Sequence, residues 1–111
     1  MGLEKIVVSQ EVSDYFEELI LILYKDEYFG FVESATAYVD RIIDFIFHSI
    51  GTYPRNIAPE KLQKFGSYYL IFKANDHTSW YIFFDFDEIE NIYLISAILN
   101  NHSPSIRFMN L

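Results

Sequence analysis

Two kinds of hydrophobic pattern divide the chain. In the first half, apolar residues recur at intervals of three and four, which is typical of amphipathic helices. This spacing predicts a helix over residues 10–24 and a second helix that begins at Phe31 or Ser34 and ends near Gly51. A short β-branched run at residues 5–9 predicts a strand before them, and Ser9 or Ser13 can cap the first helix.

The second half changes to strand-like patterning. Residues 51–66 carry the glycine and proline content of a loop, with one helical turn expected at 59–62, where Pro59 suits a first turn. Three segments rich in β-branched and aromatic residues follow, and turn residues separate them. We expect three antiparallel strands, at residues 67–74, 79–87 and 91–100.

The middle strand indicates how these elements pack. Trp80, Ile82, Phe84 and Phe86 share one face of it, and Tyr81 and Phe83 lie on the other. The predicted order is β-α-α-β-β-β, in which a hairpin of helices covers an antiparallel C-terminal meander. This is a two-layer α+β fold in a single domain, residues 1–111. The pattern does not fix where the first strand docks.

Composition and charge limit the classes of function. The net charge is −8, and residues 1–50 carry −7 of it, which argues against a surface built mainly for nucleic acid. The absence of cysteine excludes disulfides and thiolate metal sites, and the three histidines lack metal-ligand spacing, so we expect no cofactor and no metal. The longest apolar run, Leu19 to Tyr24, is too short to span a membrane, and the basic start of a secretory signal is missing; both favour a cytoplasmic protein.

The element order, the strand sequences SYYLIFKAN and TSWYIFFDFD, and the ending IYLISAILNNHS together resemble the RelE/ParE superfamily of bacterial toxins. The resemblance implies a toxin from a toxin–antitoxin pair, whose C-terminal segment lies beside the loop that precedes the meander. In the branch similar to YoeB, a histidine at the end of the last strand lies by the scissile phosphate of messenger RNA, and His102 matches that position. A glutamate after a proline before the meander matches Glu60.

The resemblance therefore implies a ribosome-dependent endoribonuclease with His102 and Glu60 as acid and base. Lys61, Lys64, Lys73 and Arg107 are the candidate phosphate contacts, because phosphodiester cleavage needs donors aimed at the developing negative charge. Tyr69 stands where family nucleases carry an arginine, and asparagines precede His102 in place of a basic residue.

Each of these residues also has a plainer interpretation. His102 lies in a loop-like sequence, and Glu60 suits the start of a helix. His77 is best explained as a solvated turn residue, and His48 as a favourable charge at a helix end. The acids from Asp85 to Glu90 lack the pattern of a calcium loop and indicate a solvated hairpin end.

Three functions stay open: a messenger RNA endonuclease, an inhibitor that acts by binding DNA gyrase without chemistry, and a non-toxic protein-interaction domain. The expected partners are a cognate antitoxin, then the ribosome with its messenger RNA or the gyrase, and a second copy of the chain in a homodimer. The many aromatic residues favour a core and a protein interface over stacking on RNA bases, because few basic residues flank them.

Overall fold

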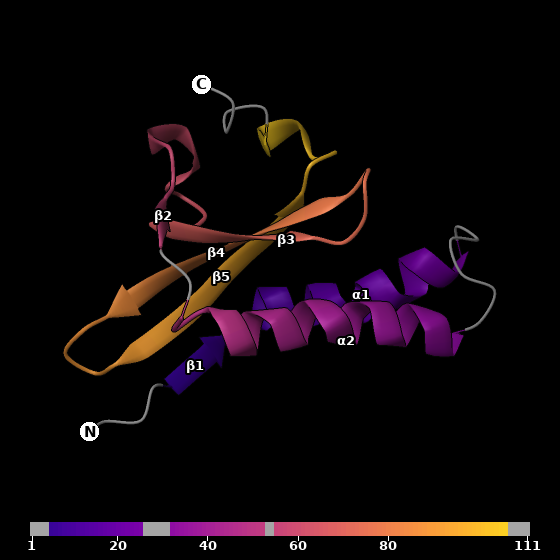
Figure 1. Ribbon diagram of the computed structural model, residues 1–111, viewed down its shortest axis with the longest axis horizontal. Coiled ribbons are helices and arrows are strands. Elements are labelled where there is room, and N and C mark those ends of the chain that lie inside the picture. Colours follow the sequence, from indigo (N-terminus) through magenta and orange to yellow (C-terminus); the bar gives the residue numbers. More distant parts are fainter. Residues whose placement is uncertain (1–4, 26–31, 53–54, 107–111) are drawn as a thin grey trace.

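The computed structural model describes residues 5–25, 32–52 and 55–106. Its elements are β1 (Lys5–Val8), α1 (Gln10–Lys25), α2 (Val32–Ser49), β2 (Asn56–Ile57), the 3-10 turn η1 (Glu60–Leu62), β3 (Tyr68–Lys73), β4 (Ser79–Asp87) and β5 (Ile92–Asn100). Figure 1 shows the two helices side by side across one face of the sheet. The predicted α+β fold, with its meander covered by a helix hairpin, is confirmed. No helix in the described ranges is both long and apolar enough to cross a membrane.

The sheet contains five strands in the order β1-β5-β4-β3-β2. The first strand, whose place the sequence left open, pairs in parallel with the start of β5, from Lys5 opposite Ile92 to Val8 opposite Ile95. The other pairings are antiparallel. The two-residue strand β2 lies inside the segment expected to be a loop, and it adds an edge to β3.

The helices bury a first core against the sheet. Ser9 caps α1, since its hydroxyl oxygen accepts a hydrogen bond from the Val12 backbone N–H at 3.2 Å. The alternating face predicted for β4 is confirmed, because Trp80, Ile82 and Phe84 are buried in this core with the apolar stripes of both helices. The helical spacing of the first half thus positions the layer that covers the sheet.

A second, smaller core covers the opposite face. Leu62 of η1 and Phe83 of β4 are fully buried there, together with Ala58 and Ile106. The single helical turn predicted at residues 59–62 is confirmed, and Ile106 brings the end of the described chain against it. The loop before the meander and the C-terminal segment are therefore neighbours, as the resemblance implied.

A β-bulge fixes where this second layer meets the sheet. The register between β4 and β5 shifts between Phe83 and Phe84, which leaves Ser96 as the extra residue of β5. The Ser96 hydroxyl donates a hydrogen bond to the carbonyl oxygen of Phe65, and Gly66 packs directly against the β4 backbone. The segment after η1 is thus held on the bulge.

Candidate functional site

His102 lies at the end of the molecule where the tip of the β3–β4 hairpin, the end of β5 and the C-terminal half of α1 meet. These elements enclose a hollow of about 540 Å³, which we call the histidine hollow. Its lining residues are Tyr15, Leu19, Ile22, Leu23, Tyr38, Asn75, His77, Thr78, Trp80, Asn100 and His102. Two imidazoles, from turns that are distant in sequence, therefore border one space.

A set of asparagine side chains holds the two histidine turns together. The Asn101 amide nitrogen donates a hydrogen bond to the His77 carbonyl oxygen at 3.0 Å, and the Asn101 amide oxygen accepts one from the Ser79 backbone N–H at 2.9 Å. The Asn75 side chain accepts hydrogen bonds from the backbone N–H groups of His77 and Thr78. The Asn75 contacts shape the turn itself, and the Asn101 contacts fix the position of the β3–β4 turn relative to the end of β5.

Aromatic side chains form the inner wall of the histidine hollow. Trp80 is buried, and its indole N–H donates a hydrogen bond to the Tyr38 hydroxyl at 2.9 Å. The Tyr15 ring lies 6.5 Å from the Trp80 ring, centroid to centroid. Burial raises the pKa of the Tyr15 phenol above its usual 10.0, and the Glu18 carboxylate adds to the rise. Trp80 is 2% exposed, and the Tyr15 and Tyr38 rings are inclined to its plane by 59° and 68°. The wall is therefore apolar, with the Tyr38 hydroxyl held by the Trp80 indole N–H.

The charge of the lining differs from that of the whole protein. The net charge of the chain is −8, yet the described residues that line the histidine hollow include neither Asp nor Glu. They also include neither Lys nor Arg, so the two imidazoles are the groups there that can carry positive charge. Histidine is the side chain that most readily gives and takes a proton near neutral pH. The arrangement suits a ligand that combines an aromatic ring with an anionic group.

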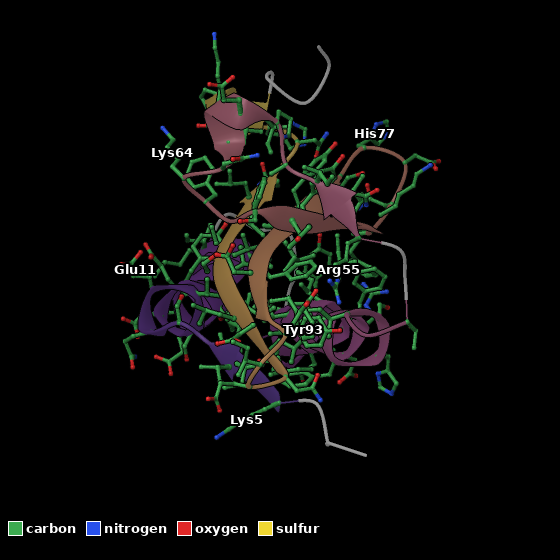
Figure 2. All side chains as sticks on the ribbon, turned by 90° about the vertical axis from the view of Figure 1, so that its left-hand side faces the viewer. Lys5, Glu11, Arg55, Lys64, His77 and Tyr93 are labelled. Atoms are coloured by element: carbon green, nitrogen blue, oxygen red, sulfur yellow. The ribbon has the colours of Figure 1, made fainter. Side chains whose placement is uncertain are left out.

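The other candidate site residues do not line this hollow. Glu60 and Lys61 are exposed on η1, which covers the opposite face of the sheet. Lys64 lines a groove beside β5, and Lys73 lines a hollow formed with the C-terminal half of α2. Figure 2 shows Lys64 and His77 on opposite sides of the molecule. Arg107 lies outside the described residues.

Tyr69, at the position where the family carries an arginine, is also on the η1 side. Its ring packs against Tyr81 at 6.2 Å and Phe83 at 6.0 Å, so it contributes to the second core. Arg55 does not reach His102 either, because its guanidinium lies over the Phe86 ring at 4.2 Å. The resemblance to the nucleases groups Glu60 with His102, whereas in the structure Glu60 lies on η1 and does not line the hollow that His102 shares with His77.

The sequence analysis explained His77 as a turn residue, and its hydrogen bonds confirm the turn without excluding a second role. One signal could have paired it with His102. Strand β5 runs antiparallel to β4, so the end of β5 lies beside the start of β4. The turn at residues 75–78 leads into β4 and therefore must approach residues 101 and 102. Within the described ranges, no group of three or more His, Cys, Asp or Glu residues is placed to hold a metal ion.

Comparisons of the chain with protein-family models, with curated protein sequences and with solved structures gave no significant match.

Proposed function

We propose that the protein is a toxin-like endoribonuclease whose reaction takes place in the histidine hollow. The observation that carries this proposal is the pairing of His77 and His102 on one aromatic-walled space without acidic lining residues. An apolar wall of aromatic side chains suits a nucleobase, and a border of histidines suits a phosphate. The resemblance to the RelE/ParE toxins adds the cognate antitoxin and the ribosome as expected partners.

Two imidazoles supply what RNA cleavage by an internal attack requires. One takes the proton from the ribose 2′-hydroxyl, and the 2′-oxygen forms a bond to phosphorus while the bond from phosphorus to the 5′-oxygen breaks. The other imidazole, protonated at the start, gives its proton to the departing 5′-oxygen. The products are a 2′,3′-cyclic phosphate and a 5′-hydroxyl. The protonated imidazole also offsets the negative charge of the phosphate. The other lining residues can stabilise that charge only through neutral hydrogen-bond donors.

The acidic character of the protein does not oppose this location. Most acids of the described chain lie on the two helices, where Glu11, Glu17 and Asp40 are exposed to solvent. The histidine hollow lies at the end of the helix hairpin, and its lining includes neither Asp nor Glu, although Asp76 lies in the β3–β4 turn that borders it. RNA can therefore approach from the hairpin tip, away from the helical surface that carries most of the negative charge.

Cleavage of a short RNA by the purified protein tests this proposal. General acid–base catalysis contributes about a hundredfold or more per group, so His102→Ala and His77→Ala should each lower the rate by at least about that factor. The double variant should lose little more than either single one, since the two groups act in one step. His48→Ala is the matched control, because His48 lies on α2 beside Lys73. Cleavage that survives in both single variants would overturn the proposal.

Glu60→Gln tests the acid–base assignment that the resemblance implied. Glu60 is exposed on η1, on the other face of the sheet from the helices that border His102. We therefore expect this variant to cleave RNA at the wild-type rate. In cells, the readout is growth arrest when the protein is expressed without the gene of the expected antitoxin. His102→Ala should abolish this arrest.

The second candidate is an inhibitor that acts by binding a protein such as DNA gyrase. The observation that favours it is that, among the described residues, neither lysine nor arginine lines the histidine hollow. Inhibition of DNA supercoiling in vitro distinguishes the two functions. In that case growth arrest would persist in His102→Ala, and purified protein would leave RNA intact.

A further inference from the structure

One edge of β5 changes its surroundings halfway along the strand. Its first four residues pair with β1, and the last backbone hydrogen bond on that side runs from the Ser9 N–H to the Ile95 carbonyl oxygen at 2.9 Å. The chain then turns away into α1. Residues 97–100 pair with β4 on their other side, after the bulge at Ser96, but among the described residues no strand lies along the outer edge of residues 96–100.

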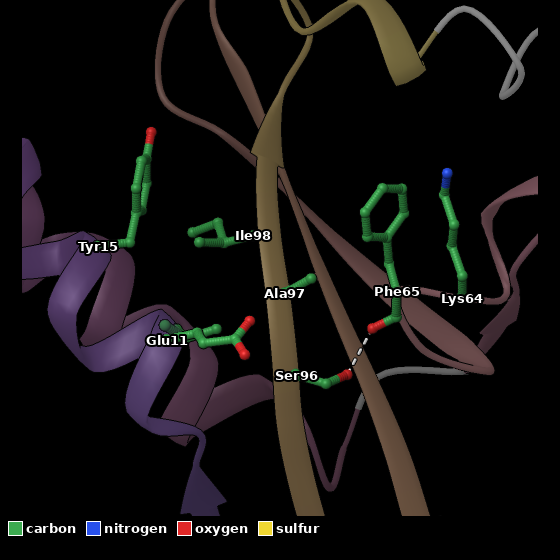
Figure 3. A pocket seen from close by; sticks show the side chains of 8 residues that line it. Glu11, Tyr15, Lys64, Phe65, Ser96, Ala97 and Ile98 are labelled. Atoms are coloured by element: carbon green, nitrogen blue, oxygen red, sulfur yellow. Dashed lines mark hydrogen bonds between the residues drawn. The ribbon is translucent and has the colours of Figure 1, made fainter.

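This open edge is the floor of a groove. The groove has a volume of about 500 Å³, and we call it the edge groove. Its lining residues are Glu11, Val12, Tyr15, Lys64, Phe65, Ser96, Ala97 and Ile98. Figure 3 shows Glu11 and Tyr15 of α1 on one side of β5, and Phe65 and Lys64 on the other. The two layers that sandwich the sheet thus project past its edge as walls.

The sequence of this edge lacks two features that usually protect such strands, a charge and a proline. Natural sheets block their edges with charged residues, with proline or with a covering element. The sequence of residues 96–100 is SAILN, which contains neither a charge nor a proline. The Ser96 hydroxyl is already engaged with the Phe65 carbonyl oxygen, and this bond holds one wall in place beside the edge. A second sheet would bring its own covering layers against the two walls, whereas a single extended chain brings none.

The charges on the walls indicate the chemistry of that chain. Alternate side chains of an added strand point to opposite walls. Those directed toward α1 meet Glu11 and the hydroxyl end of Tyr15, on a helix that also exposes Asp14 and Glu18. Those directed the other way meet Ala97 and the ring of Phe65, over which the Lys64 ammonium lies at 5.2 Å, so this wall is apolar and carries one positive charge that disfavours a basic side chain. A chain that alternates basic and apolar residues therefore complements both walls.

We infer that the edge groove takes an extended segment of a partner protein, basic at alternate positions, which adds to the sheet beside residues 96–100 and in line with β1. The main-chain hydrogen bonds to β5 supply affinity that is independent of sequence, and Glu11 selects the basic residues. This binding does not rest on RNA cleavage. His77 and His102 do not line the edge groove. A protein that fails to cleave RNA can therefore still be tested for peptide binding, and a protein that fails to bind the peptide can still be tested for cleavage.

The probe is a short synthetic peptide with blocked ends, in which lysine alternates with valine, titrated by calorimetry at low salt. We expect binding in the micromolar to millimolar range. Glutamate in place of the lysines should abolish binding, and a proline at the central valine should weaken it strongly because it removes a backbone donor. These peptide variants are tested on the unmodified protein, so no outcome depends on the folding of a variant.

Protein variants then locate the binding site. Glu11→Lys should weaken binding of the lysine peptide by about tenfold, since it replaces an attraction with a repulsion. Glu17→Lys is the matched control, because Glu17 lies on the same helix but lines a groove between α1 and α2. The peptide should also slow hydrogen exchange of backbone amides within residues 96–100. Absence of binding, equal affinity in the two variants, or unchanged exchange at this edge would each overturn the inference.

Discussion

Replacing Gly66 with alanine tests how closely the second layer approaches the sheet. Gly66 is buried, with a φ of +159°, and an added Cβ would lie 2.7 Å from the Phe84 backbone nitrogen and 3.1 Å from the Phe83 carbonyl carbon. Those atoms belong to β4, which is held between β3 and β5 and cannot move aside without breaking ladder hydrogen bonds. An alanine there combines overpacking with a backbone conformation that only glycine adopts easily.

The two costs give the size of the expected effect. Overpacking typically costs about 1–3 kcal/mol, and the backbone strain about the same. We expect Gly66→Ala to lower the free energy of unfolding by about 3 kcal/mol, out of a total of about 5–15 kcal/mol for a domain of this size. The urea midpoint would then fall by about 1.5–2 M.

Urea unfolding followed by the fluorescence of Trp80 measures this change. Gly51→Ala is the matched control, because Gly51 is exposed and is not at positive φ. The urea midpoint of Gly51→Ala should differ from that of the wild type by no more than a change of about 0.5 kcal/mol in the free energy of unfolding would cause. If Gly66→Ala unfolds at the same urea concentration as the wild type, the segment after η1 does not pack on the bulge, and the wall of the edge groove is misplaced.

Three further changes test the first core. Tyr38→Phe removes the hydroxyl that accepts a hydrogen bond from the buried indole N–H of Trp80, and thermal unfolding should show a loss of about 1–3 kcal/mol. Ser9→Ala removes the cap of α1 and should cost about 1 kcal/mol by the same measurement. Because the folded state holds the Tyr15 proton more tightly than the unfolded chain does, stability should fall as the pH rises above 10.0. Tyr15→Phe should reduce that fall in urea unfolding across this pH range; an equal fall in both proteins would show that the Tyr15 phenol is not the cause.

Much of the fold follows from spacing in the sequence. The helical stripes and the alternating aromatic strands each have one dominant period, so the two helices and the three meander strands could be placed to within one or two residues. The parallel position of β1 could not, because a four-residue strand with three β-branched residues suits any edge of the sheet. The strand β2 was missed because two residues carry no period at all.

The candidate site was harder to predict for a different reason. His102 was singled out by its position at the end of a strand. Its neighbour in space is His77, because the β3–β4 turn lies beside the end of that strand. Asn101, which joins the two turns, reads in the sequence as an ordinary loop residue. Lys61 and Lys64 were grouped with His102 as candidate phosphate contacts, but spacing in the sequence does not show which cleft a side chain enters, and in the structure neither of them lines the histidine hollow.

The most direct test of the two-histidine site is nuclear magnetic resonance with an RNA whose 2′-hydroxyls are methylated and which therefore cannot be cleaved. The account predicts that the imidazole signals of His77 and His102 shift together with the indole N–H signal of Trp80, while the backbone signals of η1 stay in place. Shifts confined to Glu60, Lys61 and Lys64, with both imidazole signals unchanged, would contradict it and would place RNA on the opposite face of the sheet.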